Sequence, residues 1–221
     1  MIPFIGPIIS AITSFVSTIG PAVARVATVL VTKLPEITRT IVSVAKIIVT
    51  VADALGLKNM MEPEELGAKM TQEGTRKRMD NESMEDYMAY LKKEVELDRE
   101  RLLKMSDLEK VEMNAIGIGA IAQSIQEKTG VEISGDFIVD AYNMKLTADE
   151  ITAFIKNFEK NELSSMDLLG KFLEGKLDQK DLKDVMDVVL GTEKELNPND
   201  SNAEIMVKIE ELKEAIQNSK K

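Results

Sequence analysis

The feature that most constrains this chain is its N-terminal segment, because residues 1–24 contain no charged side chain. Within and just beyond this segment, Pro7, Pro21 and Pro35 follow one another at intervals of 14 residues. Proline is favoured in the first turn of a helix, where its missing N–H leaves no hydrogen bond unmade. The spacing therefore predicts three short helices, each with a proline near its start.

A helix of this length would be about 21 Å long, shorter than the roughly 30 Å hydrocarbon core of a bilayer. A kinked helix through Pro21 is the alternative, since residues 1–24 are long enough to span. Beyond them, four cations between Arg25 and Lys46 interrupt the apolar runs, and each costs about 2.5–3.5 kcal/mol at the bilayer centre. At most one span is expected, and the many β-branched residues leave short strands as a minor alternative.

The segment from Pro35 to Gly56 has the clearest helical pattern, with polar side chains every three to four residues opposite an apolar face. Together with the preceding segment it makes an apolar surface that must be covered by protein or lipid, since a soluble monomer exposes only a few hundred Å² of such surface. The residues expected to form this assembly or membrane face are Ile8, Ile12, Phe15, Ile19, Val26, Leu30, Ile37, Ile41, Val44, Ile48 and Val51.

Charge separates this arm, residues 1–56, from the rest of the chain. The arm carries a net charge of +2 in a chain of net charge −10, so residues 57–221 hold −12. An acidic protein repels phosphate backbones, and nucleic acid is therefore not an expected partner. The polar residues 57–82 contain one proline and two glycines, which is typical of a connector, with a short helix expected after Pro63.

Residues 83–221 are predicted to form an acidic helical domain that begins with long helices over 83–129. An apolar stripe runs from Met84 to Met105, although Asp98 stands where the stripe requires an apolar residue. The pair Ser106 and Glu109 is a capping box that starts or restarts a helix.

Three similar motifs, LTADEI, LSSMDL and LDQKDL, follow between residues 146 and 182. Each has an N-cap residue, Thr147, Ser164 or Asp178, followed three positions later by an acid. They predict short capped helices within 147–190, the third ending at Gly191. A C-terminal amphipathic helix is expected over 201–218.

The chain contains no histidine and no cysteine, which removes imidazole bases, thiolate nucleophiles and the common zinc ligands. The stretch GIGAIA, residues 117–122, matches a dinucleotide fingerprint, but the preceding residues are helix-like and no strand–helix alternation follows. We interpret Ala115, Gly119 and Ala122 as a small-residue stripe that lets two helices approach closely. No catalytic residue, cofactor or metal is therefore predicted.

These patterns predict an all-α fold, with an apolar N-terminal arm of short proline-initiated helices and an acidic multi-helix body. The expected function is that of a non-enzymatic assembly protein, a subunit of a large complex such as a phage particle or an injection machine. Its arm would be buried between copies of the chain or against other subunits. The alternative is a pore-forming or membrane-penetrating protein whose arm enters a bilayer. No signal peptide is evident, because no cation precedes the apolar stretch.

Overall fold

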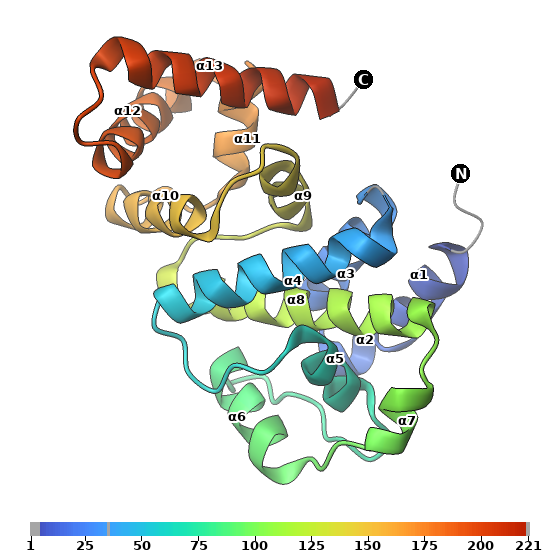
Figure 1. Cartoon of the computed structure of the whole chain (residues 1–221). Helices are drawn as coiled ribbons and strands as arrows, with labels where there is room; N and C mark the ends of the chain where they lie inside the picture. The colour runs from blue at the N-terminus through green and yellow to red at the C-terminus, as the bar shows by residue number, and fades with distance from the viewer. Residues whose placement is uncertain (1–4, 35, 220–221) are drawn as a thin grey trace. The chain divides into compact units, whose positions relative to one another are not determined.

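The computed structural model describes residues 5–34 and 36–219, and in these ranges the chain is helical, with one isolated β-bridge and no strand. The predicted all-α class is confirmed. The chain divides into two compact units, the first ending at Lys128 and the second beginning at Thr129 (Figure 1).

The first unit contains eight helices within the described residues, and the N-terminal arm supplies half of them. They are α1 (Ile5–Ser14), α2 (Val16–Ile19), α3 (Pro21–Lys33), α4 (Ile37–Ala54), α5 (Pro63–Thr71), α6 (Met84–Glu94), α7 (Arg99–Lys104) and α8 (Asp107–Thr129).

Two of the three predicted proline-initiated helices are confirmed within the described residues. Pro7 lies in the first turn of α1, and Pro21 is the first residue of α3. Gly20 precedes α3 with φ of 89°, a conformation that glycine adopts without steric cost. The third expected start, Pro35, lies outside the described residues.

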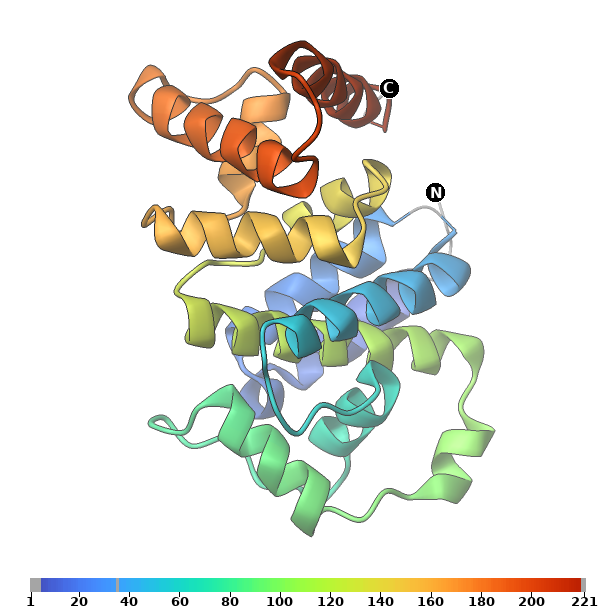
Figure 2. The same cartoon turned by 60° about the vertical axis from the view of Figure 1, so that its left-hand side comes forward.

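Helix α8 is the centre of the first unit, because every residue from Val111 to Ala122 is buried. Most residues of this stretch are glycine, alanine or isoleucine, so the helix has small or apolar residues on all its faces. Other helices can therefore cover it from several directions. Both views show α8 running beside α4, with the N-terminal helices behind (Figures 1 and 2).

The predicted long helix from Ser83 is wrong in one respect, because the chain leaves the helical conformation between α6 and α7. Asp98 explains the break, since its carboxylate accepts a hydrogen bond from the Arg101 N–H at 2.9 Å and caps α7. Gln72, just after α5, holds the same loop through its side chain, which donates to the Glu96 carbonyl at 3.0 Å and accepts from the Asp98 N–H at 3.3 Å.

Residues 57–82, predicted as a polar connector, contain the short helix that was expected after Pro63. This helix, α5, is buried over most of its length, including the side chain of Lys69. The Lys69 ammonium donates to the Leu91 carbonyl at the end of α6 and lies 3.3 Å from a Glu65 carboxylate oxygen. The segment is therefore packed within the first unit.

The second unit contains five further helices within the described residues. They are α9 (Gly135–Asn143), α10 (Ala148–Lys160), α11 (Asp167–Leu173), α12 (Gln179–Leu196) and α13 (Asn202–Ser219). The capping boxes predicted at Thr147 and Ser201 are confirmed by reciprocal hydrogen bonds with the glutamate three residues later. Helix α12 continues through Gly191, where the sequence predicted its end.

The cap predicted at Ser164 is wrong. The Ser164 carbonyl accepts a hydrogen bond from the Glu132 N–H, and the Met166 N–H donates to the Glu132 carbonyl, so this stretch is extended and α11 begins only at Asp167. Asp178 does precede α12 as its N-cap residue, but its side chain makes no capping hydrogen bond.

Candidate functional site

The predicted assembly or membrane face points into the first unit. Nine of its eleven residues are buried by the chain itself, and Phe15 and Val26 are half-buried. The buried ones are Ile8, Ile12, Ile19, Leu30, Ile37, Ile41, Val44, Ile48 and Val51. The cover that this apolar surface requires is thus supplied by the rest of the same unit.

The opposite face of α4 is exposed, as the helical pattern predicted. Its polar residues Arg39, Ser43, Lys46 and Thr50 lie on the surface. Val42, with 46% of its surface exposed, interrupts this polar face. The amphipathic pattern was therefore interpreted correctly, and the apolar side is the inner one.

Glycines bring two helices of the first unit, α3 and α5, into close contact with α8. A Cβ atom at Gly117 would lie 2.0 Å from the Pro63 carbonyl oxygen, and one at Gly67 would lie 2.0 Å from the Met113 carbonyl oxygen, so α5 and α8 touch through paired glycines. At Gly119 a Cβ atom would lie 2.7 Å from the carbonyl oxygen of Val23 in α3.

This packing confirms the predicted role of Gly119 in a close helix approach. The GIGAIA stretch lies in the middle of α8 and no strand precedes it, so the context of a dinucleotide fingerprint is missing. Gly117 and Gly67 were not identified from the sequence, and only their partner atoms reveal their role.

Among the described residues of the first unit, Glu112 is the one acid whose pKa is strongly raised. Its side chain is buried, with 6% of the residue exposed, and its Oε1 atom has no hydrogen-bond partner among the described residues. Burial, reinforced by the charge of Glu109, raises the pKa of Glu112 to about 7, and the positive charge of Arg101 opposes this shift. No sequence motif marks this residue.

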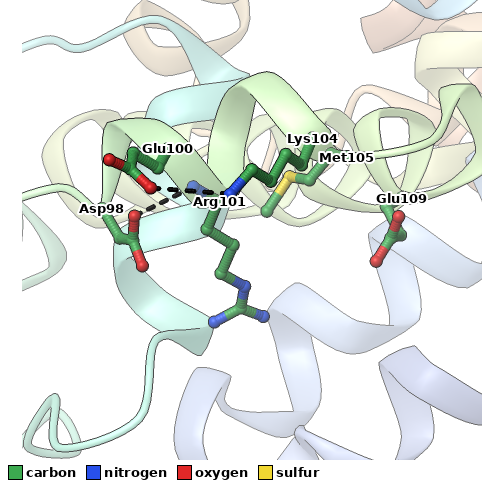
Figure 3. Close-up of a pocket in the computed structure, with 6 residues that line it drawn as sticks. All are labelled: Asp98, Glu100, Arg101, Lys104, Met105 and Glu109. Carbon is green, nitrogen blue, oxygen red and sulfur yellow. Dashed lines mark hydrogen bonds and ion pairs between the residues drawn. The ribbon is translucent and has the colours of Figure 1, made fainter.

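A pocket of about 370 Å³ lies at the turn from α7 into α8 (Figure 3). Its lining residues are Asp98, Glu100, Arg101, Lys104, Met105 and Glu109. Most of its polar groups already serve the helix ends: Asp98 caps α7, Glu109 accepts from Ser106, and Glu100 lies 3.5 Å from the Lys104 ammonium. The Arg101 guanidinium has no hydrogen bond or ion pair with any described residue.

The second unit has an apolar surface that the sequence analysis missed. Leu182 and Met186 of α12 are 43% and 40% exposed, although such side chains are usually covered. Leu190 continues their line at a four-residue spacing and joins a pocket of about 360 Å³ between α12 and α13. We call this the α12–α13 surface and define it by Leu182, Met186, Leu190 and Met206.

The sequence contains a signal for this surface, namely the four-residue spacing of Leu182, Met186 and Leu190. Helix α12 has a buried stripe that includes Val185, Val188 and Val189, and the line from Leu182 through Leu190 lies beside it rather than within it. The apolar face of α12 is therefore wider than one contact with the rest of the second unit requires.

In the part of the chain that the structure describes, no helix is both long and apolar enough to cross a bilayer. The same residues contain no cluster of three or more acids that could hold a metal ion. No family model, curated protein or solved structure matches the chain.

Proposed function

We propose that the protein is a non-enzymatic helical assembly protein that associates with copies of itself, as a subunit of a larger complex such as a phage particle or an injection machine. The observation that carries this proposal is the α12–α13 surface, where Leu182, Met186 and Met206 are each 40–44% exposed. The N-terminal arm is already engaged within the first unit, so subunit contacts are assigned to this second surface.

The physical argument is the free energy of burying apolar side chains. Covering a Leu or Met side chain contributes about 1.5–3 kcal/mol when burial is complete, and less here because these side chains are already half-buried. A symmetric contact would use the line from Leu182 to Leu190 on both copies, since a two-fold interface brings the same patch from each subunit together.

The test is the oligomeric state of the full chain, measured by light scattering after size-exclusion chromatography. We expect a defined oligomer for the wild type and a monomer for the double variant Leu182→Asp/Met186→Asp. The matched control is Val42→Asp, which places the same charge at an exposed valine of α4 in the first unit. A wild-type chain that stays monomeric up to high concentration would contradict the proposal.

A second candidate, a membrane-active protein, is supported by a separate observation. No charged side chain occurs in described residues 5–24, and the first cation, Arg25, is exposed. If α1 to α3 leave the first unit, they present an uncharged apolar segment to a bilayer.

This candidate is tested by release of a dye trapped in liposomes. Ser10→Asp adds a charge at an exposed position of α1, which the folded protein tolerates but an inserted helix does not. Thr50→Asp, at an exposed position of α4, is its control. We expect leakage by the wild type and the control and none by Ser10→Asp; equal leakage by all three, or by none, would exclude insertion of α1.

A further inference from the structure

Glu112 stands out because its carboxyl group is buried in α8 and one of its two oxygens has no hydrogen-bond partner among the described residues. It belongs to the stretch of α8 from Val111 to Ala122 in which every residue is buried. Its Oε1 atom lacks a hydrogen bond from any described residue. An ionised carboxylate in this environment loses its hydration, and few hydrogen bonds from the protein replace it.

The helical repeat places Glu112 on the side of α8 that meets the N-terminal helices. Glu112 and Gly119 are seven residues apart, so their directions from the helix axis differ by only about 20°. Gly119 is the point where α8 touches Val23 of α3, and α1 packs against α3. A charge on Glu112 therefore acts on the packing of the N-terminal helices.

The charged groups near Glu112 come from α5, α7 and α8. From α5, Glu64 accepts a hydrogen bond from the Asn114 side chain at 3.2 Å, and Glu65 pairs with Lys69. Helix α1 has no titratable residue, and Arg25 and Lys33 of α3 are exposed. On α8 itself the nearest acid is Glu109, one turn earlier, which disfavours ionisation of Glu112, and from α7 Arg101 favours it.

The Arg101 side chain could move toward Glu112 and favour its ionised form. In Figure 3 its side chain extends away from Glu100 and Lys104, and no marked interaction reaches its guanidinium. Its helix, α7, has only six residues and buries none of them. A small movement of α7 would therefore break few packing contacts.

We propose that protonation of the buried Glu112 sets how tightly the N-terminal helices make their contact with α8, and that Arg101 moderates this effect. When Glu112 is protonated, α8 packs against α3 as a neutral surface. When Glu112 is ionised, the buried charge loosens this packing, and Arg101 limits the loss by approaching it. The contact depends on neither of the proposed functions.

The direction of the pH effect on stability follows from proton linkage. The pKa of Glu112 is raised from the usual 4.5 to about 7 in the folded chain. The folded state therefore binds this proton more tightly than the open state, and its stability is lost as pH rises from the lower to the higher value. Between pH 5.5 and pH 8 the equilibrium constant for opening should increase about 25-fold.

The test is hydrogen exchange of the full chain, followed by mass spectrometry at pH 5.5 and pH 8 and corrected for the intrinsic exchange rate. For peptides from residues 5–33 we expect protection in the wild type to be about 25-fold lower at pH 8. Glu112→Gln should remove this difference. Glu193→Gln, which alters the buried glutamate of the second unit, should leave the difference in place.

Arg101→Gln provides a second, independent variant, because Arg101 is exposed and its replacement does not disturb the core. It should lower the protection of residues 5–33 further at pH 8 and leave it unchanged at pH 5.5. Equal wild-type protection at the two pH values would overturn the proposal. So would a pH difference that persists in Glu112→Gln, or an Arg101→Gln variant that matches the wild type at pH 8.

Discussion

The crossing of α5 and α8 allows a sharp test of the packing, through the substitution Gly117→Ala. The added methyl group would lie 2.0 Å from the Pro63 carbonyl oxygen and 2.6 Å from its carbonyl carbon and Cα. Carbon and oxygen atoms rarely approach closer than about 3.3 Å, so the two helices must separate by about 1 Å. The atoms in the way belong to the backbone, so no side-chain rotation relieves the clash.

Two contributions of opposite sign set the magnitude. Overpacking a well-packed contact costs about 1–3 kcal/mol and sometimes more, whereas alanine gains about 1 kcal/mol over glycine in a helix interior. Separation at Gly117 would also open the reciprocal contact between Gly67 and Met113, where a Cβ atom has the same 2.0 Å clearance. We therefore expect Gly117→Ala to lower the free energy of unfolding by about 2 kcal/mol.

Urea unfolding followed by circular dichroism would measure this change, with Gly191→Ala as the matched control. Gly191 also lies inside a helix, α12, but a Cβ atom there would meet nothing within 4 Å. In the control variant the free energy of unfolding should increase by about 0.5–1 kcal/mol. If both variants are stabilised alike, the close contact between α5 and α8 does not exist in solution and the reasoning fails.

Thr147→Ala removes the hydroxyl of a complete capping box and should cost about 1 kcal/mol, whereas Asp178→Ala should cost less because its side chain makes no cap; thermal melts of the two variants check this. Glu112→Gln should raise the free energy of unfolding by about 3 kcal/mol at pH 8 and leave it unchanged at pH 4, because the raised pKa of Glu112 weakens the folded chain only where the group ionises; urea titrations at both pH values would show it. Calorimetric titration with NAD, FAD or ATP should detect no binding, and micromolar binding abolished by Gly119→Val would contradict the assignment of GIGAIA to helix packing.

Local patterns were sufficient where the neighbouring residues alone decide the structure. The start of α3 at Pro21 and the capping box at Thr147 were predicted correctly, since each depends on a few consecutive residues. The amphipathic pattern of α4 was also interpreted correctly, but the same pattern does not say which surface covers it. Here the cover is the chain's own α8 and its neighbours, and this could not be read from a periodicity.

Where distant residues compete, the local signals failed. Ser164 has the sequence of an N-cap, yet its carbonyl bonds to the Glu132 N–H and delays the start of α11. Asp98, the irregular position in the predicted stripe, marks a true break, because its carboxylate caps α7 and its N–H donates to the side chain of Gln72, just after α5. Glu112 looked like any surface acid, and only its burial distinguishes it from the other acids of the first unit in the described residues.

The central position of α8 has a consequence for how the chain is made. The apolar face of α3 leaves the ribosome well before α8, and its Val23 packs against Gly119, which is made about 100 residues later. At roughly 5–20 residues per second, this interval lasts about 5–20 s. During that time the nascent chain presents to chaperones, membranes and other nascent chains the uncharged surface that the finished protein conceals.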